Sequence, residues 1–232
     1  MGTLILLRHG RSTANVAGVL AGRTPGVALD EHGRAEAEAL VERLAQLPLA
    51  ALVSSPLQRC RETVASLALA RGLEVTVDDR FVEVDYGEWT GRELRKLGKE
   101  PLWKVVQTHP SAAVFPGGEG LAALQARAVA AVREWHAKLA AEHGPHVVWL
   151  VCTHGDVIKA VLADALGMHL DGFQRIVANP CSISAVSYTE TRPFVQRVND
   201  SGGDLTSLVP PKRRRKRRPS SDAMPGGSTG TG

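Results

Sequence analysis

The sequence has no run of apolar residues that approaches the ~18 to 20 needed to cross a membrane. Its first residues also lack a basic leader and a small-residue cleavage site, so nothing indicates secretion through a signal peptide. Cysteine is scarce, and Cys60, Cys152 and Cys181 are odd in number and widely spaced. This pattern argues against a disulfide framework or a zinc site. It favours reduced, buried thiols in a cytoplasmic protein.

A basic tail accounts for the net charge of +4. Seven Lys and Arg residues lie between positions 212 and 218. When they and Asp222 are removed from the 28 basic and 24 acidic residues of the chain, residues 1–208 have a net charge of about −2. The tail, 209–232, is rich in Pro, Gly and Ser, which is typical of disorder. We therefore expect one domain over 1–208 and a disordered tail that contributes little to folding or to an active site.

Short apolar segments rich in β-branched residues alternate with helical patterns along the domain. Strands are predicted at 3–7, 50–54, 74–78, 147–152, 182–189 and 194–198. Helices are predicted within 29–47, 56–72, 121–144 and 156–167. This alternation predicts an α/β fold, with a mostly parallel central sheet and helices on both faces.

Two local features refine this prediction. Ser54 or Ser55 is expected to be the N-cap of the helix that opens at Pro56, and Gly72 is expected to end it. Residues 84–118 break the alternation with scattered Pro, Gly and aromatic residues. A long irregular excursion inside a domain is typical of a lid or binding loop.

Polar residues of similar chemistry follow several of the predicted strands. Arg8 and His9 come directly after the first strand, and His154 comes directly after the strand at 147–152. Arg59 lies one helical turn beyond the second strand, and Glu83 follows the third. Taken singly, each would more often be an ordinary surface or structural residue. Ligands of open α/β sheets bind beyond the carboxyl ends of the strands, so together these residues predict a site at that edge.

The residue types suit the hydrolysis of a phosphate monoester. Arg8 and Arg59 can bind phosphoryl oxygens in a bidentate manner. The flanking cations should lower the pKa of His9 and so keep its imidazole neutral and nucleophilic. Glu83 could protonate the leaving oxygen and then accept a proton from the attacking water. This chemistry requires no metal or other cofactor.

Four sequence blocks, in order, resemble the signatures of the histidine phosphatase superfamily, which has the phosphoglycerate-mutase-like fold. They are "LLRHGRSTAN", "SSPLQRCRET", "FVEVDYGEWTG" and "CTHGDVIKAVL". The resemblance covers roughly residues 1–200 and is greatest to an actinobacterial group of histidine phosphatases and phosphomutases. It implies that His9 is phosphorylated and that Glu83 is the proton donor. The residues it implies for phosphate and substrate binding are Arg8, Asn15, Gly22, Arg59, His154 and Gly155.

Some positions depart from the family pattern. Mutases of the family typically have Glu-Arg-His-Tyr-Gly around the acid, where the Arg contacts the substrate carboxylate, but this chain has Val84 and Asp85 after Glu83. Arg11 replaces a common Glu and is expected to add a cation at the pocket mouth. A phosphatase is therefore favoured, and a phosphomutase is the alternative. A non-catalytic module that binds phospho-ligands is disfavoured, because all of the implied site residues are present.

The expected partners follow from these features. The main one is a small phosphorylated substrate, and a homodimer is a further expectation. The cations at 212–218 suit weak binding of a polyanion, although a solvated, disordered extension without a partner is the favoured interpretation. No membrane partner is expected.

Overall fold

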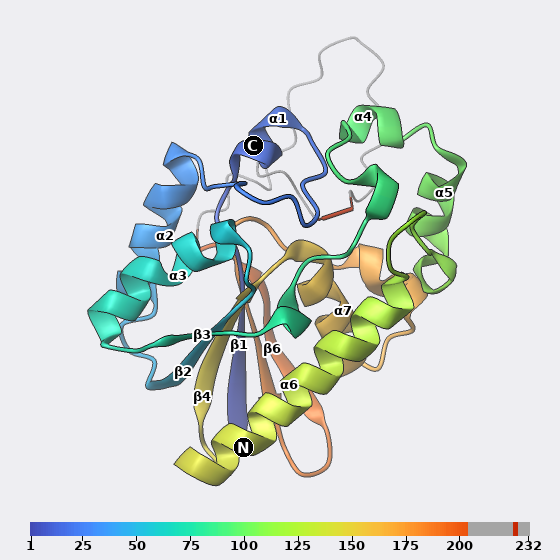
Figure 1. Ribbon diagram of the computed structural model, residues 1–232. Helices are drawn as coiled ribbons and strands as arrows, with labels where there is room; N and C mark the ends of the chain where they lie inside the picture. The colour runs from blue at the N-terminus through green and yellow to red at the C-terminus, as the bar shows by residue number, and fades with distance from the viewer. Residues whose placement is uncertain (204–224, 227–232) are drawn as a thin grey trace.

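Six strands form one mixed sheet in the order β3-β2-β4-β1-β5-β6 (Figure 1). β1 pairs in parallel with β4, β4 with β2, and β2 with β3, whereas β5 and β6 are antiparallel. The strands are β1 (Gly2–Arg8), β2 (Leu49–Ser54), β3 (Val75–Val77), β4 (Val148–Thr153), β5 (Ile183–Tyr188) and β6 (Pro193–Asp200). The predicted strands are thus all present, and the mostly parallel sheet is confirmed.

The structure is a computed structural model that describes residues 1–203 and 225–226. The expected disorder of the tail and the cationic run at 212–218 lie outside the described residues. Within the described part, no helix is both long enough and apolar enough to span a membrane. Within the described residues, all six strands end before residue 201.

Helices cover both faces of the sheet, with α2 and α3 on one side and α6 and α7 on the other (Figure 1). The α-helices are α1 (Thr13–Ala17), α2 (Glu31–Arg43), α3 (Gln58–Arg71), α4 (Leu94–Leu97), α5 (Pro101–Thr108), α6 (Leu121–His143) and α7 (Gly155–Ala165). The short 3-10 helices are η1 (Asp79–Phe81), η2 (Gly87–Trp89), η3 (Pro110–Ala112) and η4 (Leu170–Arg175).

Alternate residues of the central strands face two separate cores, as the pleat of a sheet requires. Leu4 and Leu6 of β1 pack with α6 and α7, whereas Ile5 and Leu7 pack with α2 and α3. Because both faces are covered, the central strands are apolar throughout rather than alternating, which is why short apolar runs identified them. The three cysteines are free and buried, as predicted.

The start of α3 corrects one expectation. Its N-cap is Leu57, which makes no side-chain capping hydrogen bond, and neither Ser54 nor Ser55 caps it. The Ser55 hydroxyl instead lies 2.7 Å from Nε2 of His154. The C-terminal end is as expected, with Gly72 in the left-handed region at φ 60°.

The irregular excursion at 84–118 contributes core as well as surface. Trp89 and Phe115 are buried, and their rings lie 5.3 Å apart in an edge-to-face arrangement. The Trp103 ring stacks on Trp89. These aromatic side chains therefore hold the excursion onto the domain. Helix α4, part of the excursion, lies at the same end of the molecule as α1, beyond the carboxyl ends of the parallel strands (Figure 1).

A close backbone contact joins α2 to the loop after β1. A side chain on Gly33 would place its Cβ 2.0 Å from the carbonyl oxygen of Arg11, and a Cβ on Gly10 would lie 2.7 Å from the carbonyl oxygen of Gly33. The segment His32 to Arg34, which repeats the letters of the "RHG" motif, thus has a structural role. It lets the helix support the backbone that follows His9.

Replacement of Gly33 by Ala should destabilise the protein by about 1–3 kcal/mol, because the clash is with backbone that cannot rotate away. A two-state thermal melt should show the midpoint fall by roughly 2–4 °C per kcal/mol in a domain of this size. Gly98→Ala is the matched control, since its nearest contact would be an ordinary 3.6 Å. Equal melting temperatures for the two variants would contradict the assigned contact.

Candidate active site

The central strands bring two histidines together at their carboxyl ends. Arg8 pairs with Thr153 in the β1–β4 ladder, and the backbone N–H of His9 donates to the Thr153 carbonyl at 3.0 Å. His9 and His154 are therefore neighbours on adjacent strands. Their ring centroids lie 5.3 Å apart in an edge-to-face arrangement.

Arg59, in the first turn of α3, links the two histidines. Its Nε lies 3.3 Å from Nε2 of His9, and its Nη2 lies 3.3 Å from Nδ1 of His154. The same Nη2 donates to the carbonyl of Gly22 at 2.8 Å. Nη1 is buried and has no hydrogen-bond partner among the described residues. That donor is suited to an oxygen of a bound anion.

The hydrogen bonds of His9 define which ring nitrogen has the proton. Its Nδ1 lies 2.7 Å from the carbonyl oxygen of Gly10, which can only accept, so Nδ1 has the proton. Nε2 is therefore unprotonated, and its lone pair accepts from Nε of Arg59 at 3.3 Å. The backbone N–H of Gly10 donates to the Thr63 hydroxyl at 2.9 Å, which fixes this loop to α3.

His154 is oriented in a similar way from the other side. Its Nδ1 accepts from Arg59, so Nε2 donates to the Ser55 hydroxyl at 2.7 Å. Both histidines and both arginines, Arg8 and Arg59, are buried. The Arg8 guanidinium donates through Nη1 to the carbonyl of Ala178 at 2.7 Å.

Burial and like charges decide the protonation of this cluster. Burial, followed by the cations Arg59 and Arg8, lowers the pKa of His9 well below its ordinary value. Burial and Arg59 act on the pKa of His154 in the same direction. Burial also lowers the pKa of Arg8, to about 10, which leaves it charged at neutral pH. The site thus combines fixed cations with a neutral imidazole, as the sequence predicted for His9.

Glu83 lies at the pocket in the segment that follows η1. The Thr153 hydroxyl donates to the Phe81 carbonyl at 2.7 Å, which holds this segment to the end of β4. Burial, with a further contribution from the charge of Asp156, raises the pKa of Glu83 to about 7. A sizeable fraction of Glu83 is therefore protonated at neutral pH, which suits a general acid.

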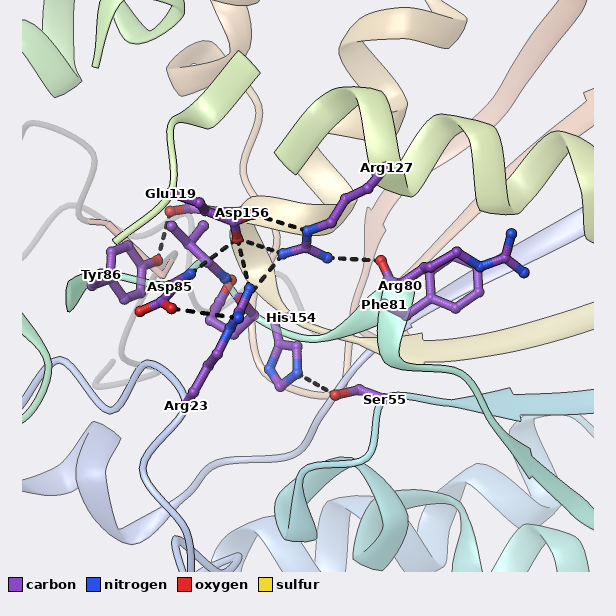
Figure 2. A network of polar contacts seen from close by, with 12 residues as sticks. Arg23, Ser55, Arg80, Phe81, Asp85, Tyr86, Glu119, Arg127, His154 and Asp156 are labelled. Carbon is purple, nitrogen blue, oxygen red and sulfur yellow. Dashed lines mark hydrogen bonds and ion pairs between the residues drawn. The ribbon is translucent and has the colours of Figure 1, made fainter. Parts of the chain in front are cut away.

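The backbone of Glu83 is held by a network centred on Glu119 (Figure 2). The Glu83 carbonyl accepts from Nε of Arg23 at 2.9 Å and from Nη2 of Arg127 at 3.3 Å. The Glu119 carboxylate accepts from both of these arginines, at 3.0 and 2.6 Å. It also accepts the backbone N–H of Asp85 at 3.0 Å. Sequence reasoning did not single out these arginines, because nothing in the local sequence indicates that both meet Glu119.

A second buried network lies on the other side of Glu83. The Asp156 carboxylate accepts from the Tyr86 hydroxyl at 2.8 Å and from Nζ of Lys159 at 2.9 Å. The side chains of Asp156 and Lys159 are each only 1% exposed. The sequence gives a weak signal for them: charged residues i and i+3 within an otherwise apolar helix.

The pocket at the end of the sheet contains most of the sequence-predicted site residues. His154 and Gly155 do not line it; His154 lies behind Arg59, and Gly155 begins α7. Sequence reasoning did not single out Ser12, Leu20, Tyr86 or Leu94 as part of the wall. The lining residues are Arg8, His9, Ser12, Asn15, Val19, Leu20, Ala21, Gly22, Arg59, Glu83, Tyr86, Leu94, Pro225 and Gly226.

Asn15 and Gly22 line the pocket for different reasons. The Asn15 side-chain oxygen accepts from the backbone N–H and the hydroxyl of Ser12, which forms a capping box at the start of α1. Gly22 has φ +50°, and a Cβ there would lie 2.9 Å from the Thr90 hydroxyl. Glycine is therefore required for the carbonyl of this residue to meet Arg59.

Two expectations about the pocket surroundings were wrong. Arg11 does not add a cation to the pocket; its Nε pairs with Asp30 at 2.7 Å, because the N-cap aspartate of α2 lies directly beside it. The tail was expected to contribute little to the active site, yet Pro225 and Gly226 line the pocket. Composition could not reveal this contact, since it depends on a single backbone hydrogen bond.

No group of three or more His, Cys, Asp or Glu side chains could hold a metal ion in 1–203 and 225–226, the part that the structure describes.

Comparison with known proteins gives consistent results. The sequence profile of the histidine phosphatase superfamily (branch 1) matches residues 4–201. Phosphoserine phosphatase 1 of Hydrogenobacter thermophilus is 30% identical over 199 residues, which cover 84% of this chain and 91% of that protein. A protein named probable phosphoglycerate mutase GpmB, from Proteus mirabilis, is 29% identical over 209 residues, or 88% of this chain and 94% of that one.

A solved structure shows the same fold. The mycobacterial glucosyl-3-phosphoglycerate phosphatase Rv2419c superposes with a TM-score of 0.75 and 26% identity. The superposition covers 85% of this chain and 98% of that chain.

The electrostatics of the site can be tested by titration. The pKa of His9 should lie below 6.5 in the wild-type protein and should rise in Arg59→Gln, because one of the flanking cations is then removed. It should not reach its ordinary value, since burial, the larger cause, remains. Nitrogen chemical shifts of labelled histidine, followed by NMR against pH, would measure both values. Arg61→Gln, two residues along the same helix and exposed, is the control. A pKa of His9 unchanged in Arg59→Gln would contradict this account.

Proposed function

Because the chain belongs to the histidine phosphatase superfamily, we propose that it is a metal-independent phosphatase that hydrolyses a small phosphomonoester through a phosphohistidine. The observation that supports this most directly is the state of His9. Its Nδ1–H is held by a backbone carbonyl, and its Nε2 lone pair faces Arg59 in the pocket. A neutral imidazole held in this way is a nucleophile.

The first chemical step transfers the phosphoryl group. Nε2 of His9 attacks phosphorus, and the bond from phosphorus to the ester oxygen breaks. Glu83 gives its proton to the departing oxygen, so that the product is a neutral alcohol. The guanidinium groups of Arg8 and Arg59 bind the phosphoryl oxygens and stabilise the charge that they share in the transition state.

The second step regenerates the enzyme. Glu83, now ionised, takes a proton from a water molecule, whose oxygen attacks the phosphorus of the phosphohistidine. The bond from nitrogen to phosphorus breaks, and inorganic phosphate leaves. Glu83 is then protonated and His9 neutral, as at the start. A group that must act first as acid and then as base works best with a pKa near the working pH, and that of Glu83 is about 7.

Phosphatase is favoured over mutase by the pocket wall. Among its described residues the wall has two arginines, Arg8 and Arg59, and both are placed for the phosphoryl group. Val84, where phosphoglycerate mutases typically have an arginine, offers no charge for a substrate carboxylate. Two of the compared proteins also have names that denote phosphatases.

Rapid quenching of the enzyme with a ³²P-labelled phosphomonoester should leave acid-labile label on His9. The label should disappear in His9→Ala, together with turnover, because no other pocket residue replaces the imidazole. EDTA should leave the rate unchanged. Retention of the label in the absence of an acceptor would favour the mutase. Full turnover by His9→Ala would exclude the mechanism.

Glu83→Gln should slow hydrolysis of alkyl phosphates by roughly 10²- to 10⁴-fold, the usual contribution of general acid catalysis. It should slow p-nitrophenyl phosphate less, since that leaving group scarcely needs a proton. The wild-type rate on alkyl phosphates should fall as the pH rises above about 7, where Glu83 loses its proton, and the variant should lack this decline. Stopped-flow or steady-state rates from pH 5 to 9 would measure both effects.

Glu88→Gln is the matched control, because Glu88 is exposed and is not part of the pocket wall. Its rates should equal those of the wild type. Equal losses on alkyl and p-nitrophenyl phosphates in Glu83→Gln would instead assign Glu83 a positioning role.

A further inference from the structure

The pocket wall includes a segment from the far end of the chain. Pro225 and Gly226 lie against the residues that line it, between α1 and α4, and appear as the short red piece in Figure 1. The segment follows the folded body only after 21 intervening residues in the sequence. A chain of 21 residues spans at most about 70 Å when fully extended, so its length allows the segment both to reach the pocket and to leave it.

The contact is made to a strong, pre-formed acceptor. The backbone N–H of Gly226 donates to Oδ2 of Asp156 at 3.0 Å. The Tyr86 hydroxyl also donates to Oδ2, whereas Nζ of Lys159 donates to the other oxygen, Oδ1. A hydrogen bond to a charged acceptor in a buried setting is stronger than one between neutral groups.

The backbone conformation at Gly226, and not a lack of space for a side chain, favours glycine at this position. Gly226 has φ +79°, in the left-handed region that other residues rarely adopt. A Cβ there would lie 3.7 Å from Leu20 and from the Tyr86 hydroxyl, and 4.0 Å from Oε2 of Glu83. A side chain would therefore meet ordinary contacts, but the backbone would be strained.

This position is also the one that the alcohol part of a substrate needs. The ester oxygen must come within hydrogen-bond distance of Glu83 to receive its proton. Gly226 lies beside that carboxyl group, and the cavity that remains in the pocket has a volume of about 30 Å³. A cavity of that size holds one or two water molecules. The segment and the alcohol part of a phosphomonoester cannot occupy the pocket together.

We propose that Pro225–Gly226 is an intramolecular ligand of the active-site pocket, which docks on Asp156 and Tyr86 and competes with the phosphomonoester. The competition with substrate rests on the proposed function, whereas the docking does not. Because the segment and the pocket belong to the same chain, docking is an intramolecular event, and even a weak contact can be populated. Docking leaves kcat unchanged. It raises the apparent KM, which equals the intrinsic KM divided by the fraction of molecules in which the segment is undocked.

The main test compares full-length Gly226→Val with Gly230→Val. Valine at φ +79° is strained, so the first variant should have a KM for phosphomonoesters lower by about threefold or more, with the same kcat. Gly230→Val makes the same chemical change four residues further on and should match the wild type. A chain that ends at Gly203, checked by circular dichroism and thermal melting, should behave as Gly226→Val does.

A second test does not depend on turnover. A synthetic peptide of residues 220–230 should bind the chain that ends at Gly203, as measured by calorimetry, and should inhibit it competitively. The same peptide with Gly226→Val should bind at least several-fold more weakly. If phosphomonoesters are not hydrolysed but the peptide binds, the docking stands and the proposed function fails.

Other results would overturn the proposal. An unchanged KM in both Gly226→Val and the shortened chain would show that the segment does not compete. A lower kcat in these variants would show that the segment closes productively over bound substrate instead. Equal binding of the two peptides would show that the contact at Gly226 does not hold the segment in the pocket.

Discussion

Two buried guanidinium groups at the end of a parallel sheet determine the charge states of the other groups in this site. A charge taken out of water is costly unless other groups compensate it. Arg8 and Arg59 are buried together, and Nη1 of Arg59 has no hydrogen-bond partner among the described residues. A bound anion would satisfy that donor and offset the charge of Arg59. Under the proposed function, affinity for a phosphoryl group is in this sense the counterpart of the folding cost.

The same constraint explains the states of the other groups. Beside two cations, an imidazolium would add a third positive charge, so His9 stays neutral and nucleophilic. The two cations lower the pKa of Glu83, whereas the charge of Asp156 raises it. Burial, the largest effect, also raises this pKa and so favours the protonated acid. In the proposed mechanism the nucleophile is neutral before the reaction, the acid is protonated in a sizeable fraction of the molecules, and charge develops only as phosphoryl transfer proceeds. Fixed donors that meet developing charge are the usual source of rate enhancement in such sites.

The parts of the site that the sequence predicted are those that the sheet positions. Arg8, His9 and His154 follow apolar strands, and the parallel pairing of β1 with β4 necessarily places them together. Arg59 and Glu83 follow strands less directly but belong to recognisable blocks. The fold could be predicted for the same reason, since its strands are short apolar runs separated by helical patterns.

The parts that could not be predicted depend on tertiary contacts without a local signature. Asp156 and Lys159 appear in the sequence as polar interruptions of a buried helix, and nothing local indicates that Tyr86 supplies a third member. The pairing of Arg11 with Asp30 depends on how α2 approaches the loop after β1. The placement of Gly226 is the extreme case, because one N–H and one left-handed backbone angle decide it.

These differences separate the two halves of the pocket. The phosphoryl half is built from strand ends and the first turn of α3, whose positions follow from the sheet itself. Under the proposed function, the alcohol half is built from Leu20, Tyr86 and Leu94, which lie in loops and in the excursion at 84–118, and Gly226 of the tail occupies this half when it is docked. A change in the first half alters the charges that the whole site depends on. A change in the second half alters only which group can approach Glu83. Under the proposed function, chemistry and substrate choice therefore rest on different parts of the chain, so that the loops and the tail can vary while a phosphohistidine mechanism is kept.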